Sequence, residues 1–294
     1  MFAGTHTALA TPFNENGTID SDAFRTLIDQ QFESGISGVV PVGTTGESPT
    51  LSNEEHHLVI ELAVKQTAGR GLVIAGTGSN STREAIDLTQ AAEQAGANAA
   101  LLVTPYYNKP SQEGLFQHYR AIAESTELPL MLYSIPGRCH IQIETDTIER
   151  LIEACPNIRA VKEAGGITER VREMRSRLPE EFEILSGDDA LTVDFMKEGA
   201  VGVVSVASNV IPSVMADLTR AMLDDRPGDA EALHARYEPF FTALLKLDTN
   251  PVPIKAALGI LGTCLPKLRL PLVALSEEKT EELRAILESL EIGR

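Results

Sequence analysis

The sequence predicts an α/β fold, a (β/α)8 or TIM barrel followed by a C-terminal helical extension. Short apolar runs of strand length alternate strictly with helical patterns over residues 1–224. The runs are continuously apolar, which is typical of parallel strands covered by helices. Eight such units occur, and eight units close most naturally into a barrel of about 250 residues.

The elements of the barrel follow from these patterns. Strands are expected at residues 7–10, 38–42, 72–75, 99–103, 129–133, 158–161, 183–185 and 202–206. Helices are expected at residues 21–34, 52–67, 81–95, 112–125, 145–154, 167–178, 191–198 and 211–223. Two helix starts carry a serine three residues before a glutamate, Ser52 with Glu55 and Ser81 with Glu84, which is the capping-box pattern.

The last part of the chain has a different pattern. Only helical patterns occur after residue 224, at residues 230–246, 254–261 and 277–290, and prolines interrupt them. We therefore expect two units, a catalytic barrel of residues 1–224 and a helical extension of residues 225–294 that packs on it.

Composition narrows the class of protein. The 25 basic and 42 acidic residues give a formal net charge of −17, which argues against nucleic acid or an anionic membrane as a partner. No run approaches the ~20 apolar residues of a membrane span, and the first residues lack the features of an export signal. The three cysteines show no zinc or CxxC spacing, so we expect free thiols and a cytoplasmic location.

Polar residues follow the predicted strands, at the end of the barrel where active sites of this fold gather. These segments are residues 43–47 (Gly-Thr-Thr-Gly-Glu), 76–79, 104–108, 133–138 and 186–189. Hydroxyls and amides suit a carboxylate, an amine suits a ketone, and phenols suit proton transfer. The sequence therefore predicts a site for a small keto acid.

Lys162 is the candidate nucleophile because it closes the apolar strand at 158–161. An ammonium in apolar surroundings loses hydration, so its pKa falls and more of it is the free amine that attacks a carbonyl carbon. The alternative is that Lys162 ends a strand and pairs with a carboxylate such as Glu163.

The other motifs also have a structural interpretation. The 43–46 turn could be only a tight turn, and Tyr106 with Tyr107 could serve packing or an interface. Asp188 could cap the next helix instead of binding magnesium. The six histidines lack HExxH spacing, so no metal site is expected.

Together, the segments 43–47, 104–108, 133–138, 161–163 and 186–189 resemble the dihydrodipicolinate synthase family. The resemblance runs from Phe2 to the final helix. A lysine on the sixth strand is shared by the wider superfamily of pyruvate-dependent aldolases and lyases, whereas the doubled threonine and Arg138 point to this family. The chain differs from the family pattern at Ser134, Cys139 and His140, near the pocket of the second substrate.

The resemblance implies a reaction without a cofactor. Pyruvate would condense with L-aspartate 4-semialdehyde through an imine on Lys162, in the first committed step of diaminopimelate and lysine biosynthesis. Tyr133 would shuttle protons, with Thr45 and Tyr107 completing a hydroxyl relay. In this family the residue matching Tyr107 reaches into the partner subunit's site, and the expected assembly is a homotetramer of two tight dimers.

The resemblance also implies a set of binding residues. Thr44 and Thr45 would hold the carboxylate of pyruvate, and Arg138 would hold that of the semialdehyde. Gly187 and the backbone of Val204 would line the pyruvate pocket.

A possible regulatory site comes from residues that this chemistry leaves unused. In relatives that lysine inhibits, matching positions form a pocket for L-lysine at the tight-dimer interface: Ser48, His56, Asn80, Glu84 and Tyr106. The alternative is that Glu84 only completes a capping box and His56 is a solvated helix residue. Asn53 stands where inhibited relatives often carry a histidine.

Two other functions remain open at this point. A sister aldolase for N-acetylneuraminate or a 2-keto-3-deoxy sugar acid would keep Lys162 and Tyr133 but would not need Arg138. A magnesium-dependent barrel lyase would use Asp188, Asp189 and Glu163 as ligands.

Overall fold

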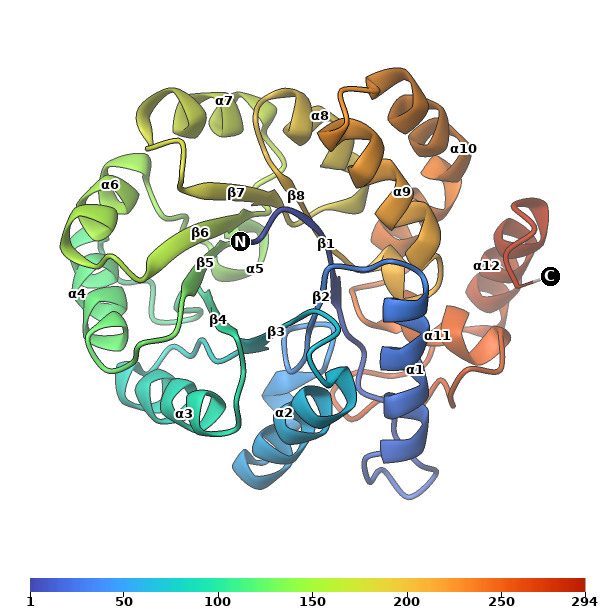
Figure 1. Ribbon diagram of the computed structural model, residues 1–294. Coiled ribbons are helices and arrows are strands. Elements are labelled where there is room, and N and C mark those ends of the chain that lie inside the picture. Colours follow the sequence, from blue (N-terminus) through green and yellow to red (C-terminus); the bar gives the residue numbers. More distant parts are fainter. Residues whose placement is uncertain (294) are drawn as a thin grey trace.

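The computed structural model describes residues 1–293, and its centre is a closed barrel of eight parallel strands. The strands are β1 (Gly4–Ala8), β2 (Gly38–Val40), β3 (Leu72–Gly76), β4 (Ala99–Val103), β5 (Leu130–Ser134), β6 (Ile158–Glu163), β7 (Glu183–Ser186) and β8 (Gly202–Ser205). Each strand pairs with the next one in the sequence, and β8 pairs with β1. Figure 1 looks along the barrel, with the helices around it. The predicted fold class is confirmed.

The helices between strands lie outside the barrel (Figure 1). They are α1 (Ser21–Glu33), α2 (Asn53–Thr67), α3 (Thr82–Gln94), α4 (Gln112–Ala123), α6 (Thr145–Ala154), α7 (Thr168–Arg177), α8 (Thr192–Lys197) and α9 (Pro212–Leu223), with a short α5 (Pro136–Cys139) after β5. Ser52 and Glu55 form the complete capping box of α2. Ser81 caps α3 alone, because the carboxylate of Glu84 accepts a hydrogen bond from the hydroxyl of Ser79 instead.

β1 begins earlier than the apolar pattern indicates, at Gly4 instead of residue 7. Two of its polar residues, Thr5 before the predicted start and Thr7 at it, are buried with partners from distant segments. The Thr5 hydroxyl donates to the Met215 carbonyl at 2.9 Å, and the Thr7 hydroxyl donates to the Gln31 side chain at 2.6 Å. Hydrogen-bonded hydroxyls can be buried at little cost, so a polar strand remains compatible with the core.

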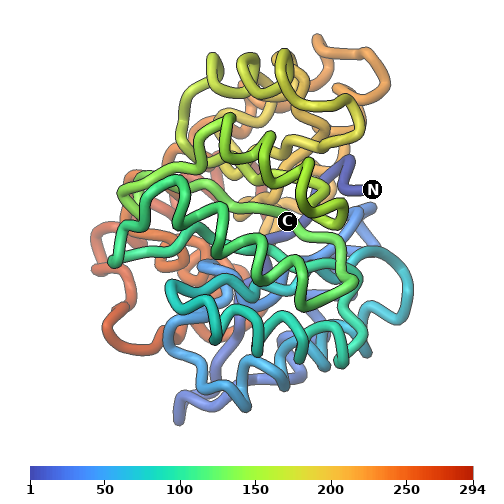
Figure 2. Tube along the Cα trace, turned by 90° about the vertical axis from the view of Figure 1, so that its left-hand side faces the viewer, coloured from blue at the N-terminus to red at the C-terminus, as the bar shows by residue number. Residues whose placement is uncertain are grey.

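The C-terminal helices are α10 (Pro227–Lys246), α11 (Val252–Ile260) and α12 (Glu277–Ser289). Phe240 of α10 and Leu283 of α12 belong to one apolar cluster with Val203 of β8 and Met215 of α9. In Figure 2 this segment begins near the top of the molecule, in orange, and its orange-red part lies on the left-hand side. No helix among residues 1–293 is both long and apolar enough to cross a membrane. The division into units at 224 and 225 stays a prediction.

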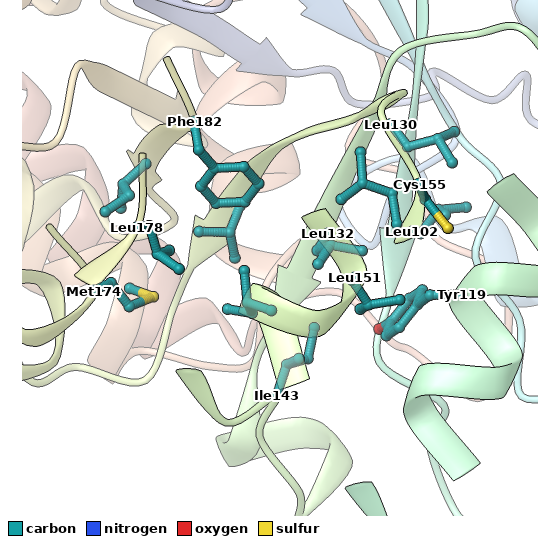
Figure 3. Close-up of a cluster of buried hydrophobic side chains, with 14 of the residues drawn as sticks. Leu102, Tyr119, Leu130, Leu132, Ile143, Leu151, Cys155, Met174, Leu178 and Phe182 are labelled. Atoms are coloured by element: carbon teal, nitrogen blue, oxygen red, sulfur yellow. The ribbon is translucent and has the colours of Figure 1, made fainter. Parts of the chain in front are cut away.

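The core has an outer and an inner part. The outer part shown in Figure 3 joins strands to the helices around them, for example through Leu130, Leu132, Leu151 and Phe182. The inner part fills the barrel with side chains that include Met131, Leu185 and Val204. The barrel interior is therefore packed, and a cavity can form only at its end.

Candidate active site

β6 points Lys162 into the barrel. Successive side chains of a strand face opposite sides. Ala160 packs in the inner core and Val161 in the outer core, so Lys162 faces inward at the end of the strand. Its side chain is buried, and its Nζ lies 4.1 Å from the centre of the Tyr133 ring.

The surroundings of Lys162 favour its free amine. Burial lowers the pKa of Lys162 to about 7, the negative charge of Asp189 opposes this fall, and the positive charge of Arg138 adds to it. A lysine with this pKa is a substantial fraction free amine at neutral pH, as a Schiff-base lysine requires.

Glu163 does not pair with Lys162, because it faces the other side of the strand. Its Oε2 accepts a hydrogen bond from Arg170 Nε at 2.9 Å, and its Oε1 accepts one from the Gly165 N–H at 2.7 Å. Both groups of the ion pair are buried, so the Glu163 carboxylate is already compensated. The structural interpretation of Lys162 as the partner of Glu163 is therefore wrong.

Asp189 supplies a negative charge to the same cavity. Its Oδ2 accepts hydrogen bonds from the backbone N–H groups of Val206 (3.0 Å) and Ala207 (2.8 Å). Its Oδ1 has no hydrogen-bond partner within the described chain. Burial raises the pKa of Asp189 to about 6, against the effect of the hydrogen bonds from the Ala207 and Val206 N–H groups. Asp189 is therefore mostly ionised at neutral pH.

Gly187 leaves room for the lysine. Its N–H donates to the Glu163 carbonyl at 2.8 Å, which fixes it beside β6. A Cβ at this position would lie 2.9 Å from Cε of Lys162 and 2.7 Å from Cβ of Ala164. Only glycine at position 187 therefore leaves enough space for the Lys162 side chain in this position.

Tyr133, at the end of β5, is a buried phenol. Burial raises the pKa of Tyr133 above its ordinary value, and the positive charge of Arg138 acts in the opposite direction. The phenol is therefore protonated at neutral pH and able to donate a proton.

Thr44 and Thr45 line the same cavity as Tyr133. The Thr45 hydroxyl accepts a hydrogen bond from Asn250 Nδ2 at 3.0 Å. The expected role of Thr45 in the relay stays a prediction. Asn250 was not predicted, since it lies in the C-terminal extension, 205 residues away in the sequence.

Arg138 lies on α5, the short helix that sequence patterns missed. Its Nη2 donates to the Asn250 carbonyl at 3.0 Å and to the Thr249 hydroxyl at 3.3 Å. The guanidinium is exposed at the cavity mouth, where a second substrate would enter. Of the residues that depart from the family pattern, Ser134 and Cys139 are buried, and the Cys139 thiol donates to the Thr104 carbonyl at 3.1 Å.

One cavity of about 230 Å³ gathers most of the predicted site. Its lining includes Thr44, Thr45, Tyr133, Arg138, Lys162, Gly187, Asp189, Val206 and Asn250. Val204 is not part of this lining, because it packs one layer deeper in the inner core. The lining residue is Val206, which follows two positions later, and strand alternation would have identified it.

Tyr107 does not reach this cavity in the single chain. Its side chain is 92% exposed, and its backbone has a positive φ of 74°. Residues other than glycine rarely adopt this backbone conformation, so the loop holds Tyr107 outward at some cost in backbone strain.

A second cavity, of about 320 Å³, contains most of the predicted lysine site. Ser48, His56, Glu84 and Tyr106 line it, and Asn80 donates its side-chain N–H to the Tyr106 carbonyl at 3.1 Å.

The second cavity shares walls with the first. Thr44, Tyr133 and Arg138 line both. His56 is buried, and its Nε2 lies 2.9 Å from the Gly76 carbonyl, so Nε2 carries a proton and donates. Burial lowers the pKa of His56, although the bond to Gly76 raises it, and the ring is neutral at pH 7.

The three carboxylates expected of a magnesium lyase do not converge. Glu163 faces the outer core and binds Arg170, and Asp188 Oδ1 accepts from the Ala190 N–H at 2.9 Å as a helix cap. Within residues 1–293, no group of three or more His, Cys, Asp or Glu side chains is arranged to hold a metal ion.

Comparison with known proteins gives consistent matches over the whole chain. The model of the dihydrodipicolinate synthetase family matches residues 1–290. The 4-hydroxy-tetrahydrodipicolinate synthase of Aquifex aeolicus (strain VF5) is 45% identical over 287 residues, which are 98% of this chain and 97% of the relative.

Two similar solved structures contain small molecules. The chloride-inhibited dihydrodipicolinate synthase from Acinetobacter baumannii, complexed with pyruvate, is 41% identical with a TM-score of 0.97 and covers 99% of this chain and 100% of its own. The DHDPS from Cyanidioschyzon merolae with lysine bound is 40% identical with a TM-score of 0.95 and covers 99% and 98% of the two chains.

Proposed function

The chain belongs to the dihydrodipicolinate synthetase family, and we propose that it condenses pyruvate with L-aspartate 4-semialdehyde to give 4-hydroxy-tetrahydrodipicolinate. The observation that carries this function is Lys162, whose pKa is lowered to about 7 in a cavity beside the phenol of Tyr133. The pyruvate-bound relative from Acinetobacter baumannii supports the choice of the first substrate.

Imine formation comes first. The free amine of Lys162 attacks the ketone carbon of pyruvate. The addition product then takes a proton from the Tyr133 phenol and loses water, which leaves a protonated imine and the Tyr133 phenolate. The hydroxyls of Thr44 and Thr45 bind the pyruvate carboxylate, because they face the cavity from one turn. Asp189 lines the same cavity, and its negative charge stabilises the positive imine nitrogen.

Carbon–carbon bond formation follows. The protonated imine withdraws electrons, so a methyl proton passes to the Tyr133 phenolate and an enamine forms. The enamine carbon attacks the aldehyde carbon of the semialdehyde, and Tyr133 donates the proton that the new alkoxide needs. The amino group of the second substrate then attacks the imine carbon, closes the ring and releases Lys162 as a free amine. No cofactor is needed, because the imine serves as the electron sink.

Two residues complete this chemistry at the cavity mouth. Arg138 binds the semialdehyde carboxylate through a bidentate pair, which its planar guanidinium favours. Tyr107 of a partner subunit extends the relay from Tyr133 and Thr45, which accounts for its exposure on a strained loop. The proposed assembly is accordingly a homotetramer of two tight dimers.

The second cavity is the proposed site for inhibition by L-lysine, and a lysine-bound relative supports this ligand. The carboxylate of Glu84 would accept the ligand's ammonium, and Tyr106 with Asn80 would bind its carboxylate. Because Thr44 and Tyr133 line both cavities, an occupied regulatory site would change the position of the relay. The proposed location is the cytoplasm, which suits three free cysteines.

Borohydride reduction in the presence of pyruvate tests the proposed function. We expect one reduced pyruvate adduct, located by mass analysis on the peptide that contains Lys162, and the same yield in EDTA. Turnover with the semialdehyde should exceed cleavage of N-acetylneuraminate. An unmodified Lys162 peptide at saturating pyruvate would exclude the imine mechanism, and faster sugar-acid cleavage would point to the sister aldolase.

A further inference from the structure

The turn that carries Thr44 and Thr45 ends at a residue in an unfavourable backbone conformation. Glu47 has a φ of 55°, in the left-handed region that residues other than glycine rarely adopt. Short backbone hydrogen bonds close the turn, from the Glu47 N–H to the Thr44 carbonyl and from the Gly46 N–H to the Gly43 carbonyl, both at 3.1 Å. A strained residue persists only where its surroundings hold it.

Lys255 of α11 holds Glu47 from the C-terminal extension. Its Nζ lies 2.6 Å from Glu47 Oε1, and both side chains are buried, at 0% and 1% exposure. Nζ also donates to the Thr11 carbonyl at 2.9 Å and lies 4.2 Å from the centre of the Phe13 ring. The other carboxylate oxygen of Glu47 accepts from the Arg269 N–H at 3.0 Å. Both oxygens of Glu47 are therefore bound by residues of the last 40 positions or so.

The same turn is anchored from the barrel side. The Thr11 hydroxyl donates to the Gly46 carbonyl at 2.8 Å, so Thr11 contacts both the turn and Lys255. Burial lowers the pKa of Lys255, and the charge of Glu47 opposes this fall. Buried ion pairs are seldom the most stable way to fill a core, so a directional role explains this pair better than packing does.

We propose that Lys255 is a positioning residue for pyruvate binding: through Glu47 it fixes the turn that presents Thr44 and Thr45 to the substrate carboxylate. This inference rests on the proposed function, and Lys255 itself does not touch the substrate. It gives the C-terminal extension a part in substrate binding. Lys162 and Tyr133 lie on barrel strands, so their positions do not depend on this contact.

The test compares Lys255→Met with the control Leu283→Ala. Leu283 is buried among the C-terminal helices and contacts neither cavity, so its loss weakens the extension without touching Glu47. The measured quantity is the pyruvate concentration that gives half-maximal borohydride trapping on Lys162. Since displacing a positioned group by ~1 Å can cost about 100-fold, we expect a 10- to 100-fold increase for Lys255→Met and less than about twofold for the control.

Glu47→Gln is the second variant, because Lys255→Met removes one half of a buried pair and could prevent folding. It keeps the side-chain size, so it should fold and shift half-saturation in the same direction by a smaller factor. The inference is overturned if both variants reach half-maximal trapping at the wild-type pyruvate concentration. If Lys255→Met does not fold, the same result in Glu47→Gln alone overturns it. An equal shift in the Leu283→Ala control also overturns it. A wild-type chain that pyruvate does not modify would instead refute the proposed function.

Discussion

Gly187→Ala should slow imine formation strongly while the fold persists. The new Cβ would lie 2.9 Å from Lys162 Cε and 2.7 Å from Ala164 Cβ. Since non-bonded carbons need ~3.5 Å, the lysine chain must move by about 0.6 Å or more. A displacement of ~1 Å can cost on the order of 100-fold in rate, and overpacking of this kind costs about 1–3 kcal/mol in stability. We therefore expect trapping by pyruvate and borohydride to slow by roughly 10- to 100-fold.

The assay is the initial rate of adduct formation at saturating pyruvate, with thermal unfolding measured on the same preparation. Gly228→Ala is the control, because a Cβ there would meet no atom within 4 Å and the residue lies in α10, away from the cavity. The control should trap pyruvate at the wild-type rate. If Gly187→Ala also traps pyruvate at that rate, then Gly187 does not set the path of the Lys162 side chain.

Four other predictions follow from the site. Trapping should rise with pH and reach half its maximum near pH 7, because burial lowers the pKa of Lys162 to about 7 and only the free amine attacks; a midpoint near pH 10 would contradict this. Arg138→Ala should raise the KM of the semialdehyde by about 10- to 100-fold, as the loss of a charged hydrogen bond predicts, and that of pyruvate much less; equal increases would remove its assigned role. Thr45→Val should lower kcat, since Thr45 lines the cavity with Tyr133 and is the proposed relay partner of Tyr133 and Tyr107; an unchanged kcat would remove Thr45 from the relay. In steady-state assays, L-lysine should inhibit the wild-type chain but not Glu84→Ala; unchanged wild-type activity at high millimolar lysine would mean that this cavity is not regulatory.

The barrel was predictable because its strands are continuously apolar and its helices carry local caps. These signals lie within a few residues of each other, as in the Ser52 capping box. The strand β1 was placed too late, since the partner that makes Thr5 acceptable in a core, the Met215 carbonyl, comes from α9. The predicted strand at 38–42 was too long, because Val42 adopts a positive φ and ends the extended backbone.

The candidate site was predictable to the extent that its residues end strands. Lys162 and Tyr133 lie where strand alternation places them. The positions of Thr44 and Thr45 depend on a turn that Lys255 holds through Glu47. Lys255 lies 208 residues after Glu47, and no local sequence pattern predicts such a pairing. Asn250 was not predicted for the same reason, because its partner Thr45 lies far away in the sequence.

The closure of β8 onto β1 also sets the order in which a growing polypeptide can build its cavity. A nascent chain that has just released β6 carries Lys162 and Tyr133, but the strand that seals the barrel has not yet been synthesised. Asn250 and Lys255 leave the ribosome later still, and contacts across such sequence distances form slowly because a long loop must close first. We therefore expect pyruvate to bind only once α11 has emerged from the ribosome. The amine of Lys162 then becomes reactive only when the chain is nearly complete.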